Sequence, residues 1–190
     1  MVRRRKHGDQ VRIIGGNWRG RRLHFHGVDN VRPTPDRVRE TVFNWLQTLI
    51  AGARCLDLFA GSGALGIEAL SRGAAEVVFV ERHTLAAHLL QENLSLLRAA
   101  SNQVVQADVL VWLRTQARPF DIVFLDPPFG QGLVVPVCEA LEQGGWLMPR
   151  TYIYLESEAE LDHPRLPATW GIIRDKRAGQ VRYRLALRSV

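Results

Sequence analysis

Through the middle of the chain, short apolar runs alternate with segments in which apolar residues recur at every third or fourth position. Five runs predict strands, at 54–59, 76–81, 104–105, 120–125 and 151–156. Four segments between them have helical spacing, at 63–70, 85–100, 109–116 and 133–143. Strands that alternate with helices predict a parallel sheet covered on both faces, which is a doubly wound α/β fold.

The carboxyl end departs from this pattern. Residues 170–174 and 180–188 are extended segments on either side of a turn, and Val181, Tyr183 and Leu185 alternate with arginines in the second of them. This pattern predicts an antiparallel β-hairpin. With the hairpin added, the predicted sheet is mostly parallel and has seven strands.

The amino end predicts a second, smaller hairpin from the extended segments 11–16 and 20–25, which turn residues separate. The stretch "RPTPDRVRETVFNWL" follows, in which apolar residues recur at helical spacing. We expect Thr34 or Asp36 to cap this helix.

Length and composition bound the class of protein. The chain has 190 residues, of which 46% are hydrophobic, which is enough for one domain with a sizeable core. No run approaches the roughly 18 apolar residues of a membrane span, and the positive cluster at the start has no apolar segment behind it as in a signal peptide. Cys55 and Cys138 lie in unrelated apolar contexts, which predicts buried thiols and a reducing compartment. We therefore expect a soluble, cytoplasmic protein, monomeric by default, with no membrane partner.

The net charge of +6 is concentrated at the amino end. Residues 1–40 hold eleven Lys or Arg against four acids. A basic end on a nearly neutral body favours contact with a polyanion such as nucleic acid, although an arginine-rich solvated surface would have the same composition. We accordingly divide the chain into a basic hairpin extension at 1–31, which contacts RNA, and a second domain at 32–190. The candidate RNA-contacting residues are Arg19, Arg21, Arg22 and Arg32.

A glycine-rich loop follows the first strand of the α/β pattern, in "LDLFAGSGALGIEAL". Gly61, Gly63 and Gly66 fit G-x-G-x-x-G between a strand and a helix, and Glu81 ends the next strand. This spacing is typical of sites for adenosine-bearing cofactors, in which an acid accepts from the ribose hydroxyls. Glycines that only pack a helix against a strand give the same pattern. The loop contains no Lys, which excludes a P-loop.

Two further acids decide between cofactors. Asp57 precedes the loop, where a carboxylate would repel the pyrophosphate of a dinucleotide but would suit a cofactor with an ammonium and a sulfonium. Asp108 ends the third strand region and could accept from an adenine amino group, although a helix cap is the better interpretation of this acid alone. Together the acids favour S-adenosylmethionine over NAD.

The fourth strand runs into Asp126-Pro-Pro-Phe129, which places a carboxylate and two residues without N–H groups at the same edge of the sheet. An exocyclic amine on a base is a poor nucleophile because its lone pair is delocalised into the ring. The Asp126 carboxylate and the Pro127 carbonyl could accept both of its hydrogens and direct that lone pair, while Pro128 holds the turn and Phe129 stacks on the base. A turn that merely closes a buried strand is the alternative.

With these motifs in place, the sequence resembles the class I S-adenosylmethionine-dependent, Rossmann-like methyltransferases that act on amino groups. More narrowly, it resembles the bacterial 16S ribosomal RNA guanine-N2 methyltransferase family, through "RIIGGNWRGRRL", "RPTPDRVRETVFNWL" and "LDLFAGSGALGIEALSRGA". The resemblance implies methylation of a guanine (guanine 966 in the family) of 16S rRNA within the small ribosomal subunit. It implies catalysis at Asp126, Pro127, Pro128 and Phe129, and cofactor binding at Asp57, Phe59, Gly61, Ser62, Gly63, Glu81, Asp108 and Thr34.

Other functions remain open on these residues. The Asp-Pro-Pro-Phe motif is shared with adenine-N6 methyltransferases of RNA and DNA, so it does not select the base. A non-catalytic RNA-binding assembly factor could keep the same fold. The histidines are too scattered to predict a metal site. Trp18 could stack on a base or pack the hairpin, with equal weight.

Overall fold

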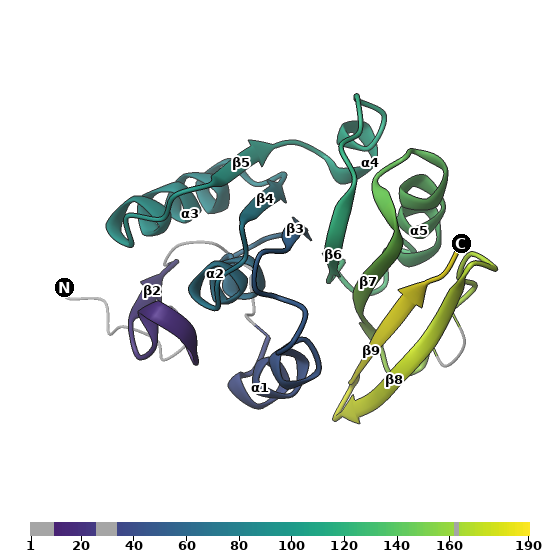
Figure 1. Cartoon of the computed structure of the whole chain (residues 1–190), viewed down its shortest axis with the longest axis horizontal. Helices are drawn as coiled ribbons and strands as arrows, with labels where there is room; N and C mark the ends of the chain where they lie inside the picture. The colour runs from purple at the N-terminus through teal and green to yellow at the C-terminus, as the bar shows by residue number, and fades with distance from the viewer. Residues whose placement is uncertain (1–9, 26–33, 162–163) are drawn as a thin grey trace.

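The structure is a computed structural model of the chain, and it describes residues 10–25, 34–161 and 164–190 (Figure 1). Within these ranges a seven-stranded sheet has the order β5-β4-β3-β6-β7-β9-β8. Its strands are β3 (Arg54–Leu58), β4 (Glu76–Glu81), β5 (Asn102–Gln106), β6 (Phe120–Leu125), β7 (Leu147–Glu158), β8 (Trp170–Ala178) and β9 (Val181–Arg188). No helix among the described residues is long and apolar enough to cross a membrane.

Pairing within the sheet follows the predicted topology. The strands from β5 to β7 pair in parallel, and β9 pairs antiparallel with both β7 and β8. The doubly wound, mostly parallel seven-stranded fold with a carboxyl-terminal hairpin is therefore confirmed.

Helices cover both faces of the sheet. They are α1 (Asp36–Trp45), α2 (Ala64–Ser71), α3 (Thr84–Leu96), α4 (Val109–Trp112) and α5 (Val134–Gln143). Buried side chains of α1, α2 and α3 pack in one core cluster, and those of α4 and α5 pack in another on the opposite face. Cys55 belongs to the first cluster and Cys138 to the second, and both are free, buried thiols as predicted.

Some element bounds differ from the sequence prediction. The helix expected at 109–116 ends after one turn. There the Trp146 indole N–H donates to the Leu113 carbonyl at 3.0 Å, so a side chain satisfies this carbonyl in place of the backbone N–H that a further helical turn would supply. The strand expected at 151–156 begins instead at Leu147 and includes Pro149, beside an irregularity in its pairing with β6. Proline is tolerated there because the regular ladder is interrupted.

The predicted cap of α1 is wrong. Helix α1 begins at Asp36 after Pro35, with no side-chain capping bond. Asp36 instead accepts from the Arg39 guanidinium at 2.6 Å.

The amino-terminal hairpin joins β1 (Gln10–Arg12) and β2 (Arg22–His24) through a 3₁₀ turn at Gly16–Trp18. Its apolar side chains Val11, Ile13, Leu23 and Phe25 lie in the same core cluster as α1, α2 and α3, and the partly buried Trp18 packs against that cluster. The described part of the hairpin is thus packed on the sheet domain.

Candidate active site

The site lies where the sheet reverses its strand order. From β3 the chain adds β4 and then β5 on one side, and it next crosses to β6 on the other side of β3. In doubly wound sheets, the crevice at the carboxyl ends of such strands is the usual ligand site. Leu58 and Leu125 are register partners in β3 and β6. The glycine loop after β3 and the Asp-Pro-Pro-Phe segment after β6 therefore leave the sheet side by side.

The backbone of the glycine loop is strongly bent. Phe59, Gly61 and Gly63 have φ angles of 64°, 53° and 74°. This left-handed region suits glycine but costs a residue with a Cβ on the order of 1–3 kcal/mol, so the conformation of Phe59 is strained. Such strain, where it occurs in proteins, is concentrated at ligand-binding sites. Ser62 is buried within the same loop.

Gly66 has a packing role. A Cβ added there would lie 2.2 Å from Cε1 of Phe79 and 2.9 Å from Oδ2 of Asp57. The third glycine of the motif thus allows α2 to approach the sheet closely. This is the packing role that the sequence alone left open.

Asp57 is buried in β3 and supports α2. Its Oδ2 accepts a hydrogen bond of 2.8 Å from the Gly66 N–H. Loss of hydration raises the pKa of Asp57 to about 8. The hydrogen bond from Gly66 lowers this pKa in part, and the charge of Glu81 raises it by a smaller amount. A carboxyl group buried in this way is a strong attractor for a cation, because a nearby positive charge would offset the cost of its ionisation.

Glu81 and Asp108 already hold backbone groups. Glu81 accepts from the Gly61 N–H and the His83 N–H, each at 2.7 Å, and so fixes the glycine loop to the end of β4. Asp108 caps α4, because its Oδ1 accepts from the N–H groups of Leu110 and Val111. Each carboxylate has lone pairs beyond these bonds, so a cap or loop brace is compatible with contact to a ligand.

The second half of the Asp-Pro-Pro-Phe segment is exposed to solvent. Asp126 is half-buried, Pro127 is buried, Pro128 is exposed and Phe129 is exposed to 43%. An aromatic side chain with this exposure at a sheet edge is available for stacking. The loop is tied back to β7, since the Gly130 N–H donates to Glu158 at 3.2 Å.

A second carboxyl group lies behind Asp126. Glu156 in β7 is exposed to only 3%, and it accepts a hydrogen bond of 2.6 Å from the Tyr154 hydroxyl. The Thr34 side chain lies close enough to Asp126 and Glu156 to lower the pKa of each carboxyl group, against the larger effect of burial. Loss of hydration, followed by the charges of Glu156 and Asp57, raises the pKa of Asp126 well above its ordinary value. Burial likewise raises the pKa of Glu156.

Sequence reasoning did not single out Glu156 or Tyr154. A signal existed, because Glu156 closes the fifth predicted strand as Glu81 closes the second, and parallel strand ends meet at one edge. The assignment of Thr34 to the cofactor stays a prediction, and its side chain also lowers the pKa of the two carboxyl groups. The edge as a whole gathers Asp57, Glu81, Asp126 and Glu156. Such an acidic crevice fits a cationic cofactor better than an anionic one. No group of His, Cys, Asp or Glu within the described ranges could hold a metal ion.

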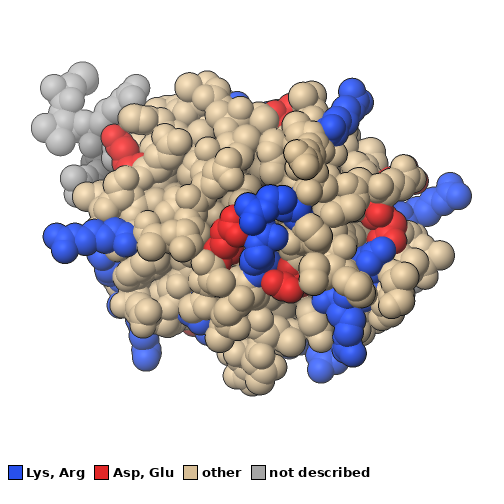
Figure 2. Space-filling model, turned by 45° about the horizontal axis from the view of Figure 1, so that its top comes forward, with Lys and Arg blue, Asp and Glu red and all other residues tan. Residues whose placement is uncertain are grey.

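The candidate RNA-contacting arginines of the hairpin are exposed. Arg19, Arg21 and Arg22 all face solvent, and Arg21 also donates to the Leu96 carbonyl at 2.9 Å. Arg32 lies outside the described residues. On the face shown in Figure 2, Lys and Arg side chains extend around the periphery, and a central basic group lies against acidic side chains.

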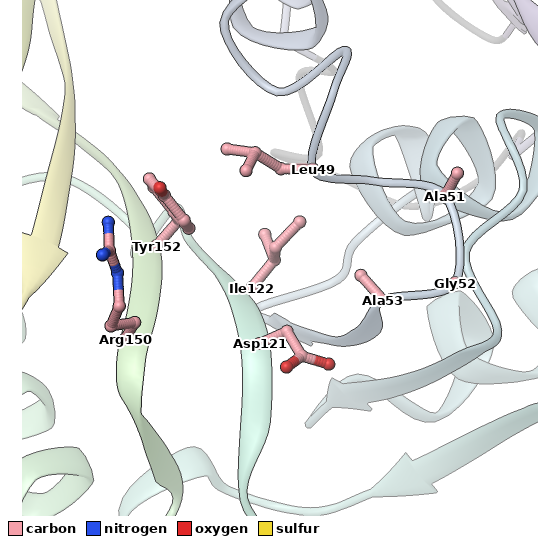
Figure 3. Close-up of a pocket in the computed structure, with 8 residues that line it drawn as sticks. All are labelled: Leu49, Ala51, Gly52, Ala53, Asp121, Ile122, Arg150 and Tyr152. Carbon is pink, nitrogen blue, oxygen red and sulfur yellow. The ribbon is translucent and has the colours of Figure 1, made fainter.

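A cavity of about 280 Å³ lies away from these residues (Figure 3). Segment 49–53 bounds it together with side chains of β6 and β7, among them Asp121, Arg150 and Tyr152. These side chains belong to the opening part of β6 and to the part of β7 beside it, whereas Asp126 and Glu158 lie at the carboxyl ends of the same strands. The cavity is therefore separate from the candidate active site.

Comparison with known proteins gives concordant matches. The Conserved hypothetical protein 95 family matches residues 11–187. The chain is 49% identical over 176 residues to ribosomal RNA small subunit methyltransferase D of Escherichia coli K12, covering 93% of this chain and 89% of that protein. It is 45% identical to the Haemophilus influenzae protein of the same name, with 93% of each covered. The solved structure of yhhF from Escherichia coli superposes with a TM-score of 0.89 at 49% identity, covering 95% of this chain and 98% of that one.

Proposed function

The chain belongs to the Conserved hypothetical protein 95 family, together with the ribosomal RNA small subunit methyltransferases D, and on that premise we propose that it is an S-adenosylmethionine-dependent rRNA methyltransferase. More specifically, we propose that it methylates the exocyclic N2 of a guanine of 16S rRNA, guanine 966 in the family, in an assembled or assembling small subunit. It would act in the cytoplasm as a monomer.

The observation that carries this proposal is the adjacency of two loops. The glycine loop and the Asp-Pro-Pro-Phe segment follow register partners in neighbouring strands, at the point where the strand order reverses. A cofactor held by the first loop would therefore have its reactive group next to the second.

The residues present fit S-adenosylmethionine. We assign Asp57 to its cationic end, Glu81 to its ribose hydroxyls and Asp108 to its adenine. The assigned loop residues are Phe59, Gly61, Ser62 and Gly63, with Thr34 at the mouth of the site. The cofactor supplies an activated methyl group, and the chain supplies alignment and exclusion of water.

Asp126 is the residue that we expect to select the amine. Its carboxylate accepts from the amino group, the Pro127 carbonyl accepts the second hydrogen, and the two prolines hold these acceptors without rearrangement. The amine becomes strongly acidic once it carries the methyl group, so Asp126 need not deprotonate it beforehand. Guanine presents its N1–H and N2–H side by side to one carboxylate, whereas adenine would place a lone pair against that charge. Phe129, exposed beside it, would stack on the base.

The exposed arginines of the hairpin would contact the RNA backbone. Within the domain division 1–31 and 32–190, we propose that the first part serves substrate binding through Arg19, Arg21, Arg22 and Arg32, while the second performs the transfer. Arginine is suited to this role because its guanidinium pairs with phosphate in a bidentate manner.

Methyl transfer from labelled S-adenosylmethionine tests the proposal. Small subunits from cells that lack this gene would be compared with free 16S rRNA, and the RNA would be digested to nucleosides. We expect label in N2-methylguanosine, with subunits as the better substrate, and loss of label with Asp126→Asn at unchanged cofactor affinity.

Other outcomes separate the alternatives. Label in N6-methyladenosine would retain the two-acceptor chemistry and reject the guanine assignment. Full turnover by Asp126→Asn would reject the two-acceptor argument. Stoichiometric cofactor binding without transfer to any subunit RNA would indicate a binding factor.

A further inference from the structure

The outermost strand of the sheet, β8, carries a concentration of positive charge. From Arg174 to Arg177 it holds three basic side chains and one acid, and all four residues are exposed. The acid, Asp175, accepts hydrogen bonds of 2.9 Å and 2.8 Å from Arg182 of the neighbouring strand. Arg174 and Arg177 each donate to a nearby backbone carbonyl and retain further N–H groups, and Lys176 has no hydrogen bond or ion pair to another described residue. The strand therefore presents unbalanced positive charge to solvent.

The strand directions bring this charge to the edge of the sheet that holds the candidate active site. Strand β9 pairs antiparallel with both β7 and β8, so β8 runs parallel to β7. Lys176 is the register partner of Tyr183, which is in turn the partner of Glu156 near the end of β7. The row continues to Asp126, which follows the last paired residue of β6. Three strand spacings of about 4.8 Å place the backbone of Lys176 roughly 14 Å from that of Asp126.

The amino-terminal hairpin lies on the other side of the active site. It contacts α2 through Glu68 and α3 through Asn93 and Leu96, and these helices pack against β3, β4 and β5. Strand β8 lies beyond β7 and β9, on the opposite side of the boundary between β3 and β6 (Figure 1). The candidate active site is therefore flanked by the exposed arginines of the hairpin on one side and by β8 on the other.

We propose that β8 is a second RNA-binding surface, in which Arg174, Lys176 and Arg177 contact phosphates of the rRNA on the side of the target base away from the amino-terminal hairpin. This inference rests on the proposed function, since it takes rRNA as the substrate. RNA is the occupant that the charge favours, because its backbone carries a negative charge at every nucleotide and Arg and Lys are the side chains that pair with phosphate. Contacts on both sides of the target nucleotide would hold the RNA across the crevice.

Charge on an edge strand also has a protective role, because it prevents pairing with another chain. Among the described residues β8 pairs with β9 alone, so it is such an edge. Either sign of charge serves that protection, and a reversal of sign therefore separates the two roles. Arg174→Glu with Lys176→Glu keeps the edge charged and removes the attraction for phosphate.

Filter binding of 16S rRNA over a salt series is the first test. The matched control is Arg114→Glu with Arg118→Glu, which reverses two charges at exposed positions before β6, near the opposite edge of the sheet. We expect the β8 double variant to lose affinity about tenfold or more at about 0.1 M salt, and the control to lose less than about twofold. The neutral pair Arg174→Gln with Lys176→Gln should lower the salt slope by roughly 1.4 to 1.8 units, the value for two phosphate contacts.

Methyl transfer at saturating S-adenosylmethionine is the second test. The β8 variants should raise the KM for rRNA and leave kcat within about twofold, because contacts to the RNA backbone act equally on the bound substrate and on the transition state. Cofactor affinity should stay unchanged. Lys176→Gln alone removes no described contact, so it keeps the test independent of folding, and it should lower the salt slope by roughly 0.7 to 0.9 units.

The results distinguish this inference from the proposed function. Equal losses in the β8 and control variants, or normal rRNA affinity in both, would overturn the second surface while methylation continues. Weaker binding to small subunits with normal binding to free rRNA would also overturn it, and would indicate a ribosomal protein as the partner of β8. A loss of rRNA affinity specific to β8, in a protein that transfers no methyl group to rRNA, would leave the surface standing and reject the proposed function.

Discussion

Asp57 in β3 and Gly66 in α2 are joined by a 2.8 Å hydrogen bond from the glycine N–H to the buried carboxyl group. The same bond fixes the approach of helix to sheet and holds a carboxyl group that the fold has removed from water. This pair of residues therefore determines both the packing of α2 and the charge of the site. Asp57 gives one prediction and Gly66 gives another.

The Asp57 carboxyl group makes stability depend on pH. Its pKa is raised to about 8, so the folded state favours the neutral form. A raised pKa gives stability that is complete below the unfolded value, near 3.9, and that is lost as the pH rises through the folded value. We expect the free energy of unfolding to fall between about pH 4 and pH 8 from this group, and Asp57→Asn to flatten that dependence. Urea denaturation across this pH range measures the free energy of unfolding of the protein and of the variant. The same pH dependence in both would contradict the raised pKa of Asp57.

Gly66→Ala should destabilise the protein through overpacking. The added Cβ would lie 2.2 Å from Cε1 of the fully buried Phe79 ring. The expected loss is about 1–3 kcal/mol in the free energy of unfolding. Gly171→Ala is the matched control, because a Cβ there meets nothing within 4 Å. Chemical denaturation of both variants checks this prediction, which fails if the two lose the same stability.

Glu68 anchors the amino-terminal hairpin to α2. Its fully buried carboxylate accepts from the N–H groups of Ile14 and Gly15, each at 2.8 Å, and pairs with Arg72 at 2.7 Å. Glu68 also faces the buried Arg39 guanidinium at 3.7 Å, and Glu68→Gln removes the charge opposite it, at an expected cost of roughly 3–5 kcal/mol.

Hydrogen exchange locates the effect of that change. The amides of Ile14 and Gly15 should lose protection in Glu68→Gln well before the amides of β3. The exposed Glu139→Gln serves as a control for loss of one charge. Uniform loss of protection across the sheet would mean that the hairpin does not open separately.

Charge reversal at Arg19, Arg21 and Arg22 should weaken binding to subunit RNA. All three are exposed on the hairpin, and each phosphate contact that is lost lowers the dependence of affinity on salt by about one unit of slope. Affinity for S-adenosylmethionine should stay unchanged. Filter binding over a salt series measures the first, and calorimetry measures the second. Reduced cofactor affinity would show that these arginines stabilise the fold and do not act in RNA binding.

Much of the fold follows from local patterns in the sequence. The alternation of apolar runs with segments of helical spacing predicts β3 to β7 and the helices between them. A strand that is buried on both faces must be an apolar run, whichever strands it pairs with. The glycine loop and the Asp-Pro-Pro-Phe segment are likewise visible in the sequence, since each follows a strand end. The carboxyl ends of parallel strands lie at the same edge of the sheet, so the sequence could predict that these two segments lie close together.

Only the tertiary structure decided which side chains meet at that edge. Thr34 was expected to cap a helix, yet α1 has no side-chain cap, and the Thr34 side chain instead lowers the pKa of Asp126 and Glu156, which lie far away along the chain. Glu68 contacts a hairpin more than fifty residues earlier, as the bonds to Ile14 and Gly15 show. The physical reason is that periodicity and turn chemistry act within a few residues, whereas contacts between distant segments depend on strand order and register, which the local pattern does not specify.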